Sequence, residues 1–250
     1  MKLSAVIITL NEERNLQRCL DSLRDVADEI IVVDSFSTDG TRNIAEAAGA
    51  RFIEHRFEGH IQQKNFALSC AHHEWILSLD ADEALDETLR KSISNTKESG
   101  HAKGYSMNRL TNYCGHWVRH CGWYPDTKVR LIRNGAGSWT GVNPHDRLDL
   151  LDNSLPMHLN GDILHYSYYT LEDHYKQIEY FGDIAARELF AQGKKISPLM
   201  IYTKVVAQFV KSFILKLGFL DGWTGWTISR MSAYATWRKY IKLQNLHHHA

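Results

Sequence analysis

The sequence contains only four cysteines among its 250 residues, and they are irregularly spaced. Four scattered cysteines are too few for a disulfide-stapled scaffold, so we expect free thiols in a reducing compartment. The chain also lacks a net charge, because 29 Lys and Arg residues balance 29 Asp and Glu residues. A neutral total argues against a protein whose whole surface binds nucleic acid. No cleavage-site pattern follows the first apolar segment, and we therefore expect no secretory signal peptide.

Two glycine-rich phosphate motifs are also missing. G-x-G-x-x-G does not follow the first apolar run, and G-x-x-x-x-G-K-[ST] does not occur. These absences exclude the usual dinucleotide fingerprint and the P-loop. Hydrophobic residues still make up 44% of the chain and aromatic residues 11%, which is enough for a sizeable core. The length predicts one large α/β domain, or a catalytic domain with an appendage.

The neutral total hides an asymmetry of charge. Between Lys194 and Lys242, nine basic residues stand against one acidic residue, Asp221, which gives this segment a charge of +8. The first 193 residues therefore carry −8. We therefore expect the acidic part and the basic segment to bind partners of different charge, and we consider them separately.

Short apolar runs alternate with helical patterns over the first eighty residues. The runs that read as buried strands are Lys2–Leu10, Glu29–Asp34, Arg51–Ile53 and Glu74–Leu79. Between them we expect a helix with Asn11 as its N-cap, a second helix that ends near Ala48, and a third over residues 60–73. This β-α-β-α-β-α-β series predicts an α/β fold with a doubly wound, mainly parallel sheet flanked by helices.

Acidic residues follow three of the expected strands: Glu12, Asp34, and Asp80 with Asp82. Ligands of open parallel sheets bind at these carboxyl ends. Because residues i and i+2 of an extended segment share a face, Asp80 and Asp82 suit Mg²⁺ or Mn²⁺ with positions left for a diphosphate. A solvated turn is the alternative for this pair. For Asp34 we favour a hydrogen bond to a nucleobase N–H.

The pattern changes in the second half of the chain. From Gly104 to Ser167, short segments rich in aromatic residues, turns and histidines predict a mixed-sheet region that completes the site. From Thr170 onward the periodicity is helical.

Three motifs resemble the family 2 glycosyltransferases of the GT-A fold in order, spacing and context. They are Ile7–Glu13 with Leu16, Val32–Thr41, and Leu79–Glu83. Later stretches are similar to a bacterial subgroup that includes the lipopolysaccharide inner-core β-glucosyltransferase: Trp123–Asp126, Arg130–Leu131, Gly141–Asp146 and Leu164–Tyr168. Where that subgroup usually reads Val-His-Glu, this chain inserts Asn-Pro before His145 and carries Asp146 in place of Glu.

The resemblance implies an inverting, metal-dependent transfer of a hexose, glucose from UDP-glucose. The residues that would bind the nucleotide-sugar are Thr9, Glu12, Asp34, Lys64 and Asp80. Asp82 and His165 would ligate the divalent cation, Mn²⁺ or Mg²⁺, although a packed histidine is the alternative for His165. Such a cation stabilises the charge on the departing diphosphate.

The resemblance also suggests a general base and residues that contact the acceptor. Inversion needs one carboxylate beside the acceptor hydroxyl, unlike the two carboxylates of retaining hydrolases. Asp146 is the candidate base and Asp126 its rival. The candidate acceptor or phosphate contacts are Trp123, Tyr124, Arg130 and His145. Both aromatic residues could equally serve as packing between sheet and loops.

We expect residues 1–170 to form the GT-A catalytic domain, with a nucleotide-sugar-binding half, 1–103, and an acceptor- and metal-completing half, 104–170. Residues 171–245 would form a basic helical extension that associates with membranes, followed by a tail, 246–250. Within Leu199–Leu217 a lysine ridge lies beside apolar ridges, which indicates an amphipathic helix at a membrane interface. Three lysines make this segment a poor membrane span. Packing on the catalytic domain or on a second subunit is the alternative.

The expected partners are a UDP-type donor, a lipid-linked saccharide acceptor and an anionic membrane surface, with no nucleic acid. This predicts a peripheral protein on the cytoplasmic face of the bacterial inner membrane, and an oligomer is compatible with the sequence. Lipopolysaccharide inner core is the first choice of acceptor and a polyprenyl-phosphate-linked glycan the second. The alternative from another class is a catalytically silent, nucleotide-sugar-binding membrane module.

Overall fold

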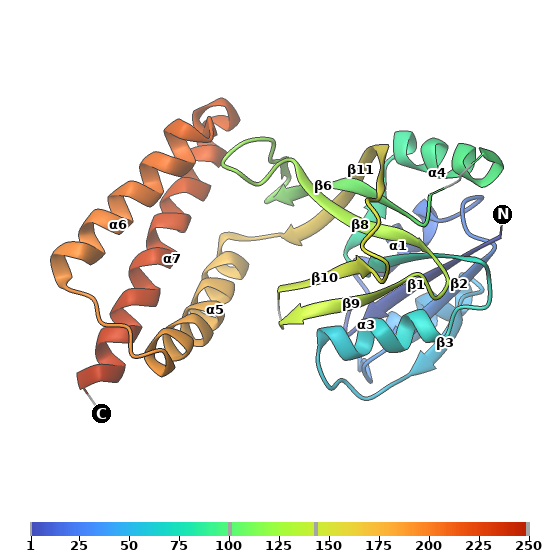
Figure 1. Ribbon diagram of the computed structural model, residues 1–250, viewed down its shortest axis with the longest axis horizontal. Coiled ribbons are helices and arrows are strands. Elements are labelled where there is room, and N and C mark those ends of the chain that lie inside the picture. The colour runs from blue at the N-terminus through green and yellow to red at the C-terminus, as the bar shows by residue number, and fades with distance from the viewer. Residues whose placement is uncertain (1, 100–101, 143–144, 249–250) are drawn as a thin grey trace. The chain divides into compact units, whose positions relative to one another are not determined.

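The computed structural model describes residues 2–99, 102–142 and 145–248 (Figure 1). The chain forms two compact units, of which the first comprises Met1–Arg109 and Asp126–Tyr166 and the second Leu110–Pro125 and Ser167–Ala250. The segment 110–125, which we expected within the catalytic part, thus groups with the C-terminal helices. One reason is that the N–H of Cys121 donates to the carbonyl of Lys216 and the N–H of His120 donates to Asp221.

A mixed β-sheet forms the centre of the first unit. Its parallel part has the order β3-β2-β1-β4, with β1 at Leu3–Thr9, β2 at Glu29–Asp34, β3 at Arg51–Glu54 and β4 at Trp75–Asp80. Beyond β4 the order continues through β8 (Asp126–Arg133), β6 (Gly104–Tyr113), β11 (Met157–Tyr168) and β5 (Glu83–Leu85). The β4–β8, β6–β8 and β5–β11 pairs are antiparallel. The predicted α/β fold class is confirmed, and the sheet gains antiparallel strands where the sequence pattern changes.

The central strands are apolar because helices cover both faces of the sheet. All but one of the residues of β1 are buried, as expected for a parallel strand between two layers. The helices of this unit are α1 (Leu16–Ser22), α2 (Thr41–Ala47), α3 (His60–Ser69) and α4 (Glu87–Ser99). A separate two-stranded sheet pairs β9 (Gly137–Val142) with β10 (His145–Leu150). The β9–β10 pair contributes Trp139 and Leu148 to one of the hydrophobic clusters.

The prediction that Asn11 caps the first helix is wrong. The helix α1 begins at Leu16 with Asn15 as its N-cap. Asn11 instead adopts a left-handed backbone conformation, with φ of 54°, and its side-chain oxygen accepts the N–H of Thr38 at 2.8 Å. Asn tolerates this conformation better than most residues. The residue therefore joins the loop after β1 to the loop after β2.

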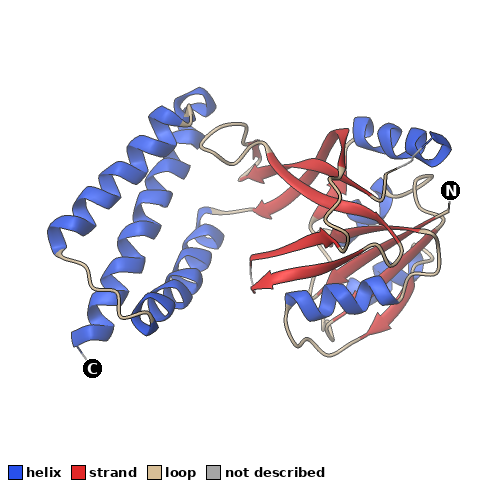
Figure 2. Cartoon of the chain, in the orientation of Figure 1, coloured by secondary structure: helices blue, strands red, loops and turns tan. Residues whose placement is uncertain are grey.

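The second unit contains three long helices, α5 (Leu171–Ala191), α6 (Pro198–Val210) and α7 (Gly222–His248). Helix α7 packs against both α5 and α6 (Figure 2). The unit also contains the short strand β7 (His116–Trp117), a π-helical turn η1 (Lys211–Leu215) that continues α6, and a 3-10 turn η2 (Gly218–Asp221). Thr170 forms a capping box at the start of α5, which fixes the point where the predicted helical region begins.

The segment Pro198–Leu215 is long and apolar enough to cross a membrane, judged by length and composition alone. Core helices of soluble proteins also meet this criterion, so it is weak support for a span. Only 11% of the segment is buried. Several of its large apolar side chains are exposed, among them Leu199, Tyr202 and Leu215, whereas Ile201 is buried.

Candidate active site

Three of the predicted site residues end neighbouring strands. Thr9 is the last residue of β1, Asp34 of β2 and Asp80 of β4. The strand register pairs Thr9 with Asp34, and Asp80 with Ile8, the neighbour of Thr9. The chain adds β2 and β3 on one side of β1 and then β4 on the other side. Ligands of open α/β sheets bind at such a switch in strand order. The topology therefore gathers these residues where a ligand is expected.

Asp34 and Thr9 differ in how their polar atoms are used. The buried Asp34 carboxylate accepts hydrogen bonds from the N–H of Ser37 at 2.7 Å and from the Ser37 hydroxyl. These bonds shape the turn after β2. The Thr9 hydroxyl is buried and has no partner in the described part of the chain. Buried polar atoms are normally paired, so this hydroxyl is open to a ligand.

Glu12 lies half-buried in the loop after β1. Burial raises the pKa of this carboxyl. The Asn15 amide, which donates to Glu12 at 2.8 Å, opposes the rise, whereas the carboxylates of Asp82 and Asp80 add to it. The pKa of Glu12 thus reports the acidic surroundings predicted at the strand ends.

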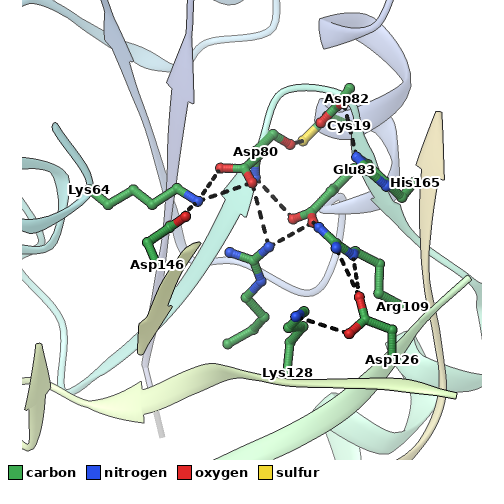
Figure 3. A network of polar contacts seen from close by, with 11 residues as sticks. Cys19, Lys64, Asp80, Asp82, Glu83, Arg109, Asp126, Lys128, Asp146 and His165 are labelled. Atoms are coloured by element: carbon green, nitrogen blue, oxygen red, sulfur yellow. Dashed lines mark hydrogen bonds and ion pairs between the residues drawn. The ribbon is translucent and has the colours of Figure 1, made fainter. Parts of the chain in front are cut away.

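Lys64 of α3 joins two of the predicted residues (Figure 3). Its Nζ lies 3.1 Å from Asp80 Oδ1 and 2.8 Å from Asp146 Oδ2. The ammonium also lies over the ring of Trp139, 4.3 Å from the centroid. The Lys64 side chain is only 7% exposed. A residue of α3 thereby connects the end of β4 with β10.

A second cation, Arg130 of β8, supports Asp80 from the other side. Arg130 Nη2 donates to Glu83 Oε1 at 2.7 Å and lies 3.5 Å from Asp80 Oδ2. Burial opposes ionisation of Asp80, but the charges of Lys64 and Arg130 outweigh it and hold the pKa of this carboxyl well below its usual range. Asp80 is therefore an anion at neutral pH. The Nε and Nη1 atoms of Arg130 are buried without partners among the described residues.

The two predicted metal ligands face each other. Asp82 Oδ2 and His165 Nε2 lie 3.2 Å apart (Figure 3). Asp82 lies in the turn after β4 and not in an extended segment, and it contacts His165, whereas Asp80 contacts Lys64 and Arg130. His165 pairs with Glu83 in the β11–β5 register. This pairing brings the histidine to the turn.

A carboxylate oxygen beside an imidazole nitrogen is a donor pair that fits a divalent cation such as Mn²⁺. Within residues 2–99, 102–142 and 145–248, no group of three or more His, Cys, Asp or Glu side chains could hold a metal by itself. Asp82 and His165 would thus be two protein ligands, and the remaining positions would fall to the ligand's oxygens.

The two candidate bases differ in their surroundings. Asp126 accepts two hydrogen bonds from Arg109, at 3.0 and 2.8 Å, and forms an ion pair with Lys128 at 2.9 Å. Burial raises the pKa of Asp126, but these two cations more than reverse the effect and lower it. Within the described residues, the cation that pairs with Asp146 is Lys64. Asp126 is therefore the more firmly neutralised carboxylate.

The remaining predicted contacts do not all fall in the described site. Trp123 and Tyr124 belong to the second unit. There the Trp123 ring packs against Tyr113 and Tyr168, with centroids 5.7 and 5.6 Å away. This packing agrees with the alternative that Trp123 fills space within its own unit. The His145 side chain lies outside the described residues.

Sequence reasoning assigned no role to Glu83, Arg109 or Trp139. The Glu83 carboxylate is fully buried, and Arg109 Nη1 lies 3.5 Å from it. Trp139 presents its ring to both Lys64 and Arg130. Glu83 ends an acidic run and Arg109 lies among polar residues, so neither stood out in the sequence pattern. Nothing in the sequence pattern distinguished Trp139 from other aromatic residues.

Known proteins are similar to this chain in sequence. The family model described as glycosyl transferase family 2 matches residues 4–120. An uncharacterized glycosyltransferase of Rickettsia prowazekii is 30% identical over 255 residues, which cover 98% of this chain and 87% of the relative. The lipopolysaccharide core biosynthesis glycosyltransferase LpsC of Rhizobium meliloti is 30% identical over 78% of this chain and 74% of LpsC.

Among solved structures, glucosyl-3-phosphoglycerate synthase from Mycobacterium tuberculosis, in complex with Mn²⁺, UDP and glucosyl-3-phosphoglycerate, is similar with a TM-score of 0.38 and 22% identity over 44% of each chain. That likeness is too remote to support an argument about the site. The family model and the relatives that match most of the chain show its family. On these grounds the chain belongs to glycosyl transferase family 2, whose members transfer sugars.

Proposed function

We propose that this glycosyltransferase moves a hexose, glucose from UDP-glucose, onto a lipid-linked saccharide of the lipopolysaccharide inner core, with inversion and with a divalent cation. The observation that carries the proposal is the 3.2 Å approach of Asp82 to His165 beside Asp80, at the switch point of the sheet. The name of the relative LpsC, which refers to lipopolysaccharide core biosynthesis, supports this class of acceptor.

The donor would lie along the ends of β1, β2 and β4. Thr9, Glu12 and Asp34 would contact its base and ribose, and the unpartnered Thr9 hydroxyl supports this assignment. Asp80 would lie on the ribose side and Lys64 near the diphosphate. Lys64 provides a compact positive charge with three hydrogen-bond donors, which suits a phosphate oxygen.

Asp82 and His165 would hold the cation. When bound, the cation supplies Lewis-acid stabilisation of the negative charge on the departing diphosphate. The turn that follows β4 places Asp82 next to Asp80, so that one short segment would serve both the cation and the donor. The β11–β5 pairing fixes His165 opposite this turn.

Asp146 would accept the proton of the acceptor hydroxyl as that oxygen attacks the anomeric carbon. A single displacement with one carboxylate is sufficient for inversion. Asp126 is less suited to the task because Arg109 and Lys128 lower its pKa, which makes a carboxylate a weaker base. Arg130 would position a phosphate, since two of its guanidinium nitrogens lack partners in the described chain. Trp123, Tyr124 and His145 remain candidates for contact with the acceptor.

The C-terminal helices would bind the cytoplasmic face of the bacterial inner membrane, where a lipid-linked acceptor is presented. Large apolar side chains are exposed there, among them Leu199 at 74%, Leu215 at 71% and Trp223 at 78%. Lys204 and Lys211 are exposed on the same helical segment. Basic residues beside aromatic and aliphatic ones are typical of helices at an anionic lipid interface. In this proposal residues 1–170 act in catalysis and 171–245 in membrane association.

Turnover of UDP-glucose in the presence of Mn²⁺ and a lipid extract tests the proposal. Transfer of glucose to a lipid fraction is expected. Stoichiometric binding of UDP-glucose without hydrolysis or transfer would instead favour a silent binding module. Mass spectrometry of lipopolysaccharide from cells that lack the gene would identify the sugar that disappears. Loss of sugar from a polyprenyl-linked glycan, with lipopolysaccharide intact, would overturn the choice of acceptor.

A further inference from the structure

The ion pair between Lys64 and Asp146 occupies the carboxylate that the proposed function needs as a base. Lys64 Nζ lies 2.8 Å from Asp146 Oδ2. Asp146 is 12% exposed and Lys64 is 7% exposed, so water shields this pair only weakly. A general base must offer a free oxygen within hydrogen-bond reach of the proton that it takes. The arrangement seen here therefore leaves Asp146 partly engaged.

The buried Lys64 ammonium keeps other partners besides Asp146. A buried ammonium that loses its partners is strongly destabilising. Lys64 retains Asp80 at 3.1 Å and the face of Trp139 at 4.3 Å when its bond to Asp146 is disregarded. Asp146 can thus lose Lys64 without leaving that cation unpaired. Lys64 can therefore exchange its bond to Asp146 for a bond to another anion.

We propose that Lys64 holds Asp146 in an ion pair until the diphosphate of a nucleotide-sugar draws the ammonium away and frees the carboxylate. This inference rests on the proposed function, because it requires a diphosphate donor at the ends of β1 and β4. Phosphate oxygens compete well for an ammonium, since charge-assisted hydrogen bonds to anions are the stronger ones. Donor binding then controls when the base is available. Lys64 is a positioning residue in this scheme, since it acts on the acceptor hydroxyl through Asp146.

A double-mutant cycle on UDP affinity tests the exchange without measuring activity. Calorimetry would give the affinity for UDP with Mn²⁺ of the unaltered protein, Lys64→Met, Asp146→Asn and the double variant. If Lys64 leaves Asp146 to bind the diphosphate, Asp146→Asn should tighten UDP binding about 3- to 10-fold because the competing partner is gone. Lys64→Met should weaken it about 10-fold or more. Adding Asp146→Asn to Lys64→Met should then change nothing.

The last comparison separates exchange from simple charge repulsion. If Asp146 merely repelled the anionic ligand, Asp146→Asn would tighten UDP binding equally with and without Lys64, and the exchange would be overturned. Asp149→Asn is the matched control, because it removes one negative charge from the same strand, β10, where Asp149 pairs with Arg147. It should leave UDP affinity within about twofold of the unaltered protein.

The outcomes also separate this inference from the proposed function. If the unaltered protein fails to bind UDP with Mn²⁺, the proposed donor is wrong and the exchange falls with it. If UDP binds but Asp146→Asn leaves the affinity unchanged, only the exchange is overturned. The double variant lacks both charges of the pair and so leaves no new unpaired charge, which guards against loss of folding. Thermal unfolding of each variant would verify that it is folded.

Discussion

The side chains of Asp82 and His165 meet across the turn that follows β4, with Oδ2 and Nε2 3.2 Å apart. The two residues are far apart in sequence, and the antiparallel β11–β5 pairing brings them together, with a hydrogen bond from the N–H of Tyr166 to the carbonyl of Asp82. In the proposed function, this carboxylate and imidazole would hold a divalent cation and would leave most of its coordination positions to the oxygens of a diphosphate. Metal binding and donor binding should therefore depend on one another.

Asp82→Asn should weaken Mn²⁺-dependent UDP binding by about 10- to 100-fold, the range seen when residues supporting a metal site are altered. The affinity measured without Mn²⁺ should change much less. Calorimetry with and without the metal checks this. The matched control is Asp21→Asn, which removes an exposed carboxylate paired with Arg24 on α1 and should leave both affinities unchanged. Equal losses with and without Mn²⁺ would contradict the assignment of Asp82 to the metal.

Asp146→Asn should reduce kcat of sugar transfer by about 10²- to 10⁴-fold, the usual contribution of a general base. Donor binding should not be lost, and it should tighten if Lys64 exchanges Asp146 for the diphosphate. Steady-state kinetics with the identified lipid acceptor, together with UDP binding, measure the two effects separately. If Asp146→Asn kept full turnover while Asp126→Asn lost it, Asp126 would be the base.

Glu83→Gln should destabilise the first unit by about 3 kcal/mol, because it leaves the buried Arg130 guanidinium with a weaker partner. Unfolding by urea, followed by a signal from Trp75 in the core, measures this loss. Glu74→Gln is the matched control, since Glu74 pairs with Arg133 at the surface, where the two side chains are 53% and 51% exposed. Exposed pairs contribute about 0–1 kcal/mol. Equal effects of the two substitutions would mean that the buried network adds no stability.

Replacing Lys204, Lys211 and Lys216 by Glu should weaken binding to vesicles that contain phosphatidylglycerol. Each basic residue near an anionic surface contributes about 1 kcal/mol, so the triple variant should lose at least about 100-fold in partition. Vesicle sedimentation measures the bound fraction. Lys176→Glu alters a lysine that is already paired with Glu172 and is expected to change binding little. Retained binding by the triple variant would argue that these lysines do not face lipid.

The second unit should lose stability as pH falls from about 6.5 to 4 because of His174. Burial lowers the pKa of this imidazole from 6.5 to about 4, so the unfolded chain takes up a proton in this range and the folded one does not. The stability that the neutral His174 imidazole provides to the folded unit is complete above pH 6.5 and disappears as pH approaches 4. The shift corresponds to about 3 kcal/mol. The difference in unfolding free energy between the unaltered protein and His174→Gln, measured across this range, isolates the effect. A constant difference would contradict it.

Much of the first unit could be predicted because its strands are short apolar runs between polar turns. Glu29–Asp34 has the bounds expected from its sequence, and the residues that end the strands meet as the parallel topology requires. The start of α1 could not be predicted in the same way. Asn11 looks like a helix cap, yet its bond to Thr38 depends on a loop far along the chain. Local propensity cannot report such a partner.

The polar network of the site shows the same limit. Glu83 contacts Arg130 because β8 inserts beside β4, out of sequence order. The pattern of Glu83-Ala84-Leu85 does not reveal that strand order. Lys64 and Asp146 were each expected at the site, but their direct contact follows from the approach of α3 to the β9–β10 sheet. The sequence motifs indicated which residues belong to the site, but the contacts among them depend on the tertiary structure.

The loops after β1 and β2 are tied to each other before any ligand arrives. The N–H groups of Asn11, Glu12 and Glu13 donate to side chains of the β2 loop, and the N–H groups of Thr38 and Gly40 donate back to Asn11 and Glu13. The conformational entropy of these two loops is thus lost during folding and not during ligand binding. In the proposed function, a substitution in either loop should alter donor binding as though both loops had been changed.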